Sequence, residues 1–135
     1  MALKNAFDIA SSAMNAQAIR INTIASNLAN ADSTTAAPED TYKAKQVIFQ
    51  TQSLGSSNSL GVRVQKIVED NTAPKVMHNP SHPHANAEGF VSLPNVNLTQ
   101  QMVDMISSSR AYQNNVETMN AAKTLLLKTL TIGQS

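Results

Sequence analysis

The amino-acid sequence predicts a mainly α protein in which long N- and C-terminal helices form a coiled-coil-like pair, with a small β-hairpin and loop region between them. Two observations carry this prediction. Apolar residues near both termini recur at alternating steps of four and three residues, which is typical of helices that pack along one another. All five prolines and three of the four glycines fall between residues 32 and 96, and prolines exclude long helices from that segment.

The N-terminal helix is expected within residues 1–31. No glycine or proline interrupts its apolar row, and Gln17 is the one polar position in it. The other members of the row are Leu3, Phe7, Ala10, Met14, Ile21, Ile24, Leu28 and Ala31. A helix of about 28 residues is roughly 42 Å long.

The C-terminal helix is expected over about residues 97–132, within a terminal segment 97–135. Asn97 is placed to cap it, with Gln100 at the third helical position as in a capping box, and Gly133 follows where a left-handed residue commonly ends a helix. Its row consists of Leu98, Met102, Met105, Ser109, Tyr112, Val116, Met119, Lys123, Leu126 and Leu130. Periodicity identifies the two rows but leaves open whether they face each other or neighbouring copies.

Residues 32–96 form the expected insert. The segments 42–49 and 62–68 have the β-branched, partly alternating pattern of short strands, and the Gly- and Ser-rich stretch 54–61 between them indicates a turn. We therefore expect a small hairpin. The two terminal segments are expected to build one inner layer, with the insert outside it.

Composition narrows the function classes. A chain of 135 residues is about one domain, and its net charge of +1 gives no overall electrostatic footprint for nucleic acid or an anionic membrane. Leu, Ile, Val and Phe make up 30 residues, barely above the roughly 20% level below which disorder is expected. Two isolated helices and a hairpin are marginally stable, so we expect other chains to complete the core.

The one candidate metal site is the histidine cluster His78, His82 and His84. Three imidazoles within seven residues could approach one ion. However, Glu88 is the one neighbouring acid, cysteine is absent, and Pro80 and Pro83 exclude helical spacing. We favour a connector stiffened by proline, and we expect no metal, other cofactor or catalytic residue. A histidine-ligated metallohydrolase is the enzyme alternative.

Five segments carry a resemblance over nearly the whole chain: residues 24–35 (IASNLANADSTT), 42–50, 61–70, 79–97 (NPSHPHANAEGFVSLPNVN) and 101–117 (QMVDMISSSRAYQNNVE). In this order they resemble the bacterial flagellar basal-body rod proteins. The positions that match the family's motifs are Ser26, Asn27, Leu28, Ala29, Asn30, His82, Pro83, Gly89, Pro94, Asn95, Val96, Arg110 and Tyr112. Asn79, Phe90 and Gln101 depart conservatively from the pattern.

The resemblance implies a structural subunit, not an enzyme, that polymerises into the axial drive shaft and transmits torque across the periplasm. The short insert points to the proximal rod, with a distal rod subunit as an alternative. Implied partners are copies of the chain, other rod proteins, basal-body ring proteins and the flagellar type III export apparatus, without nucleic acid or a small-molecule substrate. Because the N-terminus lacks the apolar core of a secretory signal, we expect export without a cleaved signal peptide.

We expect the assembly interface to lie along the two apolar rows. Its predicted members are Leu3, Phe7, Met14, Ile21, Ile24, Leu28, Leu98, Met102, Met105, Tyr112, Val116, Met119, Leu126 and Leu130. Arg110 and Glu117 lie seven residues apart and are expected to set the register. The alternative is a helical adaptor or export chaperone that binds a partner helix, which would be a folded, soluble monomer or dimer.

Overall fold

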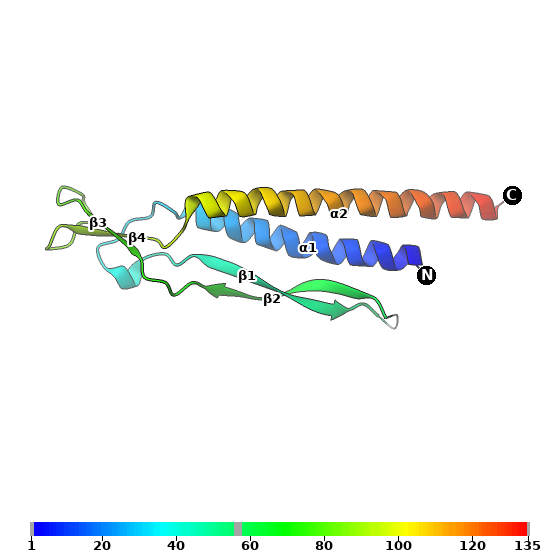
Figure 1. Ribbon diagram of the computed structural model, residues 1–135, viewed down its shortest axis with the longest axis horizontal. Coiled ribbons are helices and arrows are strands. Elements are labelled where there is room, and N and C mark those ends of the chain that lie inside the picture. Colours follow the sequence, from blue (N-terminus) through cyan, green and yellow to red (C-terminus); the bar gives the residue numbers. More distant parts are fainter. Residues whose placement is uncertain (1, 56–57, 135) are drawn as a thin grey trace.

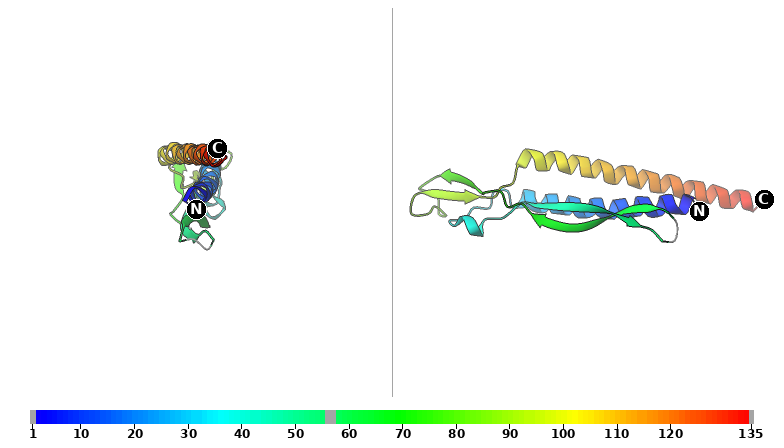
Figure 2. Two further views of the ribbon diagram at one scale, coloured as in Figure 1. Left: turned by 90° about the vertical axis from the view of Figure 1, so that its right-hand side faces the viewer. Right: turned by 60° about the horizontal axis from the view of Figure 1, so that its bottom comes forward.

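The computed structural model describes residues 2–55 and 58–134, and in it two helices run along most of an elongated molecule (Figure 1). Helix α1 spans Ala2–Ala29 and helix α2 spans Leu98–Gly133. They lie side by side in opposite directions (Figures 1 and 2). With 28 and 36 residues, they account for about half the chain, which confirms the prediction of a mainly α protein.

A β-hairpin lies along the side of α1 that faces away from α2 (Figure 1 and Figure 2, left). Strands β1 (Lys45–Ser53) and β2 (Leu60–Glu69) pair antiparallel, as the sequence predicts. β1 begins and ends a few residues later than expected, and the register shifts between Ile48 and Phe49. Such a bulge increases the twist of a two-stranded ribbon. The predicted turn includes Ser56 and Ser57, which lie outside the described residues.

A second, shorter hairpin occupies one end of the molecule, where the sequence analysis predicted only a connector. Strand β3 (Lys75–His78) pairs antiparallel with β4 (Phe90–Leu93). The Asn86 carboxamide oxygen accepts hydrogen bonds from the backbone N–H groups of Glu88 and Phe90 at 3.0 and 2.9 Å. Gly89 adopts φ +84°, a conformation that favours glycine. Pro80 and Pro83 lie in the turns that connect these two strands of four residues each.

The cap predicted at the N-terminus of α2 is present, and the left-handed residue predicted at its C-terminus is not. The Asn97 side chain accepts from the backbone N–H of Gln100 at 3.2 Å, so the predicted cap is present. The side chain of Gln100 bonds to Asp104 instead of returning to Asn97, so the capping box is only half formed. Gly133 is the last helical residue and lacks a positive φ, which makes the predicted left-handed termination wrong. A short 3-10 helix, η1 (Pro38–Asp40), precedes the first strand.

The core of the single chain is small. Its buried apolar side chains are mostly alanine and valine, and the buried residues of α2 are Ser108 and Ala122. At these two places the buried row is offset by one residue from the predicted positions Ser109 and Lys123. Small side chains therefore occupy the most buried positions of α2, whereas the pattern of large apolar residues predicted the adjacent positions. The core apolar residues are Ala10, Ala16, Ile24, Ala44, Val91, Val96 and Ala122.

Candidate assembly surface

Asn27 connects α1, β1 and α2 at the end of the helix pair near the short hairpin. It is completely buried. Its amide nitrogen donates to the Lys45 carbonyl at 2.8 Å and to Gln101 Oε1 at 3.0 Å, and its oxygen accepts from the Lys45 N–H and the Tyr42 hydroxyl at 2.9 Å each. Both donors and both acceptor positions of the amide are used, so its burial carries no unsatisfied polar group. We call this network the Asn27 brace.

Asn95 holds the chain between the two hairpins in a similar way. Its side-chain oxygen accepts from the Ala44 N–H at 2.8 Å, and its nitrogen donates to the carbonyls of Asp70 and Thr72 at 2.9 Å each. Asparagine suits both positions because one planar amide can donate and accept at once. The resemblance marked Asn27 and Asn95 as motif residues, and the structure gives each of them a bonding role.

The other motif residues divide between the turns and the helices. Asn30 donates from its side chain to the Ser26 carbonyl at the end of α1, and Pro94 and Val96 are buried before α2. An added Cβ on Gly89 would lie 2.9 Å from the Pro80 ring. The remaining members Leu28, Ala29, Arg110 and Tyr112 lie on α1 and α2 with partial or full exposure, and Pro83 lies in the turn of the short hairpin.

Each of the three histidines makes a structural contact in or beside the short hairpin. His82 accepts the backbone N–H of His84 on its Nδ1 at 3.0 Å, and His84 Nδ1 shares a hydrogen bond with the Thr34 hydroxyl at 2.7 Å. His78 packs edge-on against the Phe90 ring, with centroids 5.0 Å apart. Among residues 2–55 and 58–134, no group of three or more His, Cys, Asp or Glu is placed to hold a metal ion.

Helix α2 exposes large apolar side chains at both of its ends. Met102, Val103 and Ile106 are between 51% and 59% exposed near its start, and Leu127 and Leu130 are 55% and 57% exposed near its end. Large apolar side chains that are exposed in groups are candidates for a contact site. No helix in the described part of the chain is long and apolar enough to cross a membrane.

The predicted interface residues vary in exposure. Ile24 is buried, and Leu3, Met14, Ile21, Leu28, Met105, Tyr112, Val116 and Met119 are half-buried. Exposed members are Phe7, Leu98, Met102, Leu126 and Leu130. A small apolar hollow lined by Leu3, Phe7, Ala122 and Leu126, among others, shows that the start of α1 lies opposite this part of α2.

The total accessible surface is large for the mass. The chain exposes 8887 Å², whereas a compact monomer of 14.4 kDa is expected to expose about 6,800 Å². The difference of about 2,000 Å² reflects the elongated shape of the chain (Figure 1). An elongated chain with apolar ends on α2 is therefore suited to association.

Charged groups contribute little to the described fold. Lys4 and Asp8 form an exposed ion pair at 2.7 Å on α1, a type that contributes little to stability. Lys45 lies over the Tyr42 ring and Arg20 over the Phe49 ring, at 5.9 and 5.8 Å from the centroids. Hydrogen bonds from the side chain and then the backbone of Thr72 lower the pKa of Asp70.

Two family models of known proteins match this chain. A family model described as flagella basal body rod protein matches residues 7–37, and one described as flagellar basal body rod FlgEFG protein C-terminal matches residues 87–132. The chain is 49% identical over 134 residues to the flagellar basal-body rod protein FlgC of Yersinia enterocolitica, covering 99% of this chain and 100% of that protein.

More distant relatives also match over nearly their whole length. The FlgC protein of Salmonella typhimurium is 47% identical over 134 residues, which is 99% of this chain and 100% of that protein. The FlgC protein of Bacillus subtilis is 39% identical over 146 residues, covering 96% and 97% of the two chains. The chain belongs to the FlgC family of flagellar basal-body rod proteins.

Proposed function

We propose that this chain is a structural subunit of the proximal flagellar rod, in which neighbouring subunits cover the apolar residues exposed on its helices. Full-length similarity to FlgC rod proteins supports the rod assignment. The observation that carries the mechanism is the exposure of α2, a 36-residue helix with two buried residues, Ser108 and Ala122. A helix this exposed gains little of the tertiary packing that normally stabilises helices.

In this proposal the terminal segments 1–31 and 97–135 form an inner layer of packed helices, and residues 32–96 form an outer β-containing layer. The half-buried rows support this division because one side of α1 already faces α2 while the hairpin covers the other. Partners of the inner layer are copies of this chain and other rod proteins. Basal-body rings and the type III export apparatus are the partners proposed outside the rod.

The proposed mechanism is mechanical. Each subunit inserts its helices among those of its neighbours in a helical array that need not close, and many packed contacts in parallel transmit torque across the periplasm. The chain has 19 charged residues against 48 Asn, Ser, Thr and Gln, so its uncharged polar surface carries little desolvation cost when it is buried with hydrogen bonds. No chemical step is required.

Export through a narrow channel and rigidity in the rod are compatible if folding is completed on assembly. Helices that depend on neighbours for packing are marginal alone, and segments that order on binding lose conformational entropy at that moment. We therefore propose that the chain is exported without a cleaved signal peptide and that the exposed end of α2 becomes fully ordered only in the rod.

The test replaces apolar residues of α2 with aspartate in cells that depend on this chain for the proximal rod. Leu126→Asp should prevent incorporation into basal bodies and abolish motility, because a buried carboxylate without a partner is strongly unfavourable. Leu130→Asp tests the same surface at a residue that is 57% exposed in the single chain, where the fold itself should tolerate it. The readouts are swimming and the amount of the chain in purified basal bodies.

The matched control is Leu60→Asp, on β2 in the proposed outer layer, where the side chain is 62% exposed. This variant should assemble and swim. If both helix variants are incorporated and motile, α2 is not an assembly surface and the mechanism is wrong. A folded, soluble Leu130→Asp chain that is absent from basal bodies would support it.

A further inference from the structure

Strand β1 has an outer edge whose backbone groups do not bond to β2. In an antiparallel pair, residues directly opposite each other alternate between pairs that exchange both backbone hydrogen bonds and pairs that exchange none. Ala44, just before β1, belongs to a bonded pair, because its carbonyl accepts the Asp70 N–H at 2.8 Å. Counting along the register from there, Lys45 and Val47 belong to pairs of the second kind, so their N–H and C=O groups point away from β2.

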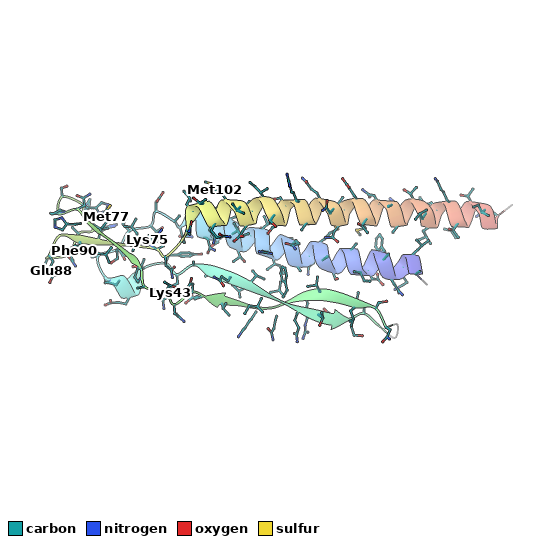
Figure 3. The ribbon with its side chains drawn as sticks, viewed as in Figure 1. Lys43, Lys75, Met77, Glu88, Phe90 and Met102 are labelled. Carbon is teal, nitrogen blue, oxygen red and sulfur yellow. The ribbon has the colours of Figure 1, made fainter. Side chains whose placement is uncertain are left out.

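The side chain of Asn27 occupies the first position on this edge. Its oxygen accepts the Lys45 N–H at 2.9 Å, and its nitrogen donates to the Lys45 carbonyl at 2.8 Å. One carboxamide therefore makes the two bonds that a residue of a third strand would make. It can do so because α1 lies beside β1 at this end of the hairpin. At the other end β2 lies beside α1, and Ser12 Oγ accepts the Val62 N–H at 3.1 Å (Figure 3).

Val47 is the next position on the edge, and α1 leaves it open. Strand β1 and α1 run in opposite directions here (Figure 1). Two residues of a strand span about 6.6 Å and four residues of a helix about 6 Å, so the helix position one turn before Asn27 comes opposite Val47. That position is Thr23, whose hydroxyl donates to the Ile19 carbonyl at 2.9 Å within α1. In the described part of the chain, no side chain bonds to the backbone of Val47.

A groove of about 360 Å³ lies at this position, between β1, α1 and α2. The polar side chains that the two helices contribute to it have other partners. Gln101 Oε1 accepts from Asn27 at 3.0 Å, and Gln100 Nε2 donates to Asp104 at 3.0 Å. Arg20 lies over an aromatic ring of β1, 5.8 Å from its centroid. The groove therefore has room for a group from outside the chain, and Val47 has two backbone groups to offer it.

The chemistry of this position selects the group that it binds. The Val47 backbone offers one donor and one acceptor side by side. A carboxylate cannot donate to the carbonyl, and an ammonium or guanidinium group cannot accept the N–H. The groove also carries both signs of charge, with Arg20 and Lys45 positive and Asp104 negative, so a charged ligand of either sign would meet a like charge. A carboxamide is neutral, donates and accepts at once, and is the group that the same edge already binds at Lys45.

We infer that the backbone of Val47 and the groove beside it bind the side-chain carboxamide of an asparagine or glutamine from a neighbouring chain in the rod. The bonds are those that Asn27 makes to Lys45, placed one position further along the edge of β1. This inference rests on the proposed rod function and adds a specific polar contact to the apolar contacts proposed for α2. Neighbouring copies of the chain can supply such side chains, since the sequence has 14 Asn and 9 Gln.

The test compares amide hydrogen exchange of the unmodified chain, isolated and in purified basal bodies, by mass spectrometry resolved by residue. In the isolated chain we expect the Val47 N–H to exchange at least about tenfold faster than the Lys45 N–H, which has a buried partner. In basal bodies the Val47 N–H should slow by at least about tenfold, and Lys45 should change little. Thr51 is the internal control, because its N–H points away from β2 outside the groove and should stay fast.

Three results of this measurement would overturn the inference. A Val47 N–H that is already slow in the isolated chain would mean that the chain fills the groove itself. A Val47 N–H that stays fast in basal bodies would mean that no partner occupies the groove. Equal slowing at Val47, Phe49 and Thr51 would show the main chain of a partner adding as a strand, not a side-chain carboxamide.

The variant Thr23→Asn tests the same site by filling it from within. It places a second carboxamide one turn before Asn27, where it can bond to Val47. We expect slower Val47 exchange in the isolated variant and about three- to tenfold less of it in basal bodies, because the carboxamide of the partner is displaced. Ala25→Asn, at an exposed position of α1, carries the same side chain outside the groove and should be incorporated normally. If Thr23→Asn slows Val47 exchange and is incorporated as well as Ala25→Asn, the inference is wrong.

Failure of this inference is distinguishable from failure of the rod function. Basal bodies that contain the chain but leave Val47 unprotected would exclude the carboxamide contact, and the rod function would stand. Motile cells carrying Leu126→Asp and Leu130→Asp chains would overturn the proposed assembly through α2, whatever the exchange at Val47.

Discussion

The two ends of the helix pair are built from different interactions. At the Asn27 brace, a buried amide ties together α1, β1 and α2 through four hydrogen bonds between 2.8 and 3.0 Å. Towards the other end, the hydroxyls of Thr118, Thr124 and Thr129 donate to carbonyls one turn earlier in α2 itself, and the leucines there are exposed. The difference shows that polar bonds hold one end of the helix pair together within the chain, and it supports the proposal that neighbouring chains cover the exposed apolar residues at the other end.

The largest effect should come from removing the Asn27 brace. Asn27→Leu keeps a similar volume but leaves the Lys45 backbone groups and the Tyr42 hydroxyl without their buried partner. We expect the free energy of unfolding of the isolated chain to fall by about 3 kcal/mol, measured by urea denaturation followed by circular dichroism. Asn22→Leu, an exposed asparagine on the same helix, is the control and should change stability by at most about 0.5 kcal/mol. Equal effects of the two substitutions would show that the hydrogen bonds of Asn27 do not stabilise this end of the helix pair.

An intermediate effect is expected where the long hairpin approaches the N-terminal half of α1. A Cβ on Gly61 would lie 2.6 Å from Ser12 Oγ, which also accepts the Val62 N–H at 3.1 Å. Gly61→Ala should push β2 away from α1 and cost about 1 to 2 kcal/mol, while leaving the Asn27 brace formed.

Hydrogen exchange resolved by residue would locate that change. We expect faster exchange around Val62 and unchanged protection at Lys45. Gly133→Ala is the control, because nothing lies within 4 Å of an added Cβ there. Faster exchange at Lys45 as well would mean that the two ends of the long hairpin open together, and that the Asn27 brace is not independent of the contact at Gly61.

The smallest effect concerns Asp70, in the turn held by Asn95. Thr72 hydrogen bonds lower the pKa of the Asp70 carboxyl from its ordinary value of 3.8, so the stabilisation is present above that value and is lost as the pH falls through the lowered pKa. Thr72→Val removes the side-chain bond and should move the pKa of Asp70 back towards 3.8, measured by NMR titration of the carboxyl. Thr51→Val, on exposed β1, should leave it unchanged. An unaltered pKa in Thr72→Val would show that the side-chain bond is not its cause.

Much of the architecture could be predicted from the sequence. Heptad spacing and the Asn97 cap located both helices, and β-branched alternation located the long hairpin. At two positions the buried residue lies one place before the predicted one, because Ser108 and Ala122 are small and a search for large apolar residues passes over them. The short hairpin was missed because the prolines around His82 favour loops, although the segment FVSL before Pro94 has strand-like composition.

The candidate site was less predictable. Apolar spacing marked residues such as Leu126 and Leu130 as interface members, and this remains a prediction that the aspartate variants test. Asn27 and Asn95 were known only as motif positions. Their bonding partners are 15 to 74 residues away in the sequence, and no local pattern reports bonds over such separations.

The most direct measurement of the central claim is amide hydrogen exchange in α2, compared between the isolated chain and the same chain in purified basal bodies. Exchange reports local opening free energies along a helix. We predict that residues 123–133 exchange rapidly in the isolated chain and become strongly protected in the basal body, while protection near Asn27 changes little. Equal protection of residues 123–133 in both states would contradict the claim that neighbouring subunits complete this surface.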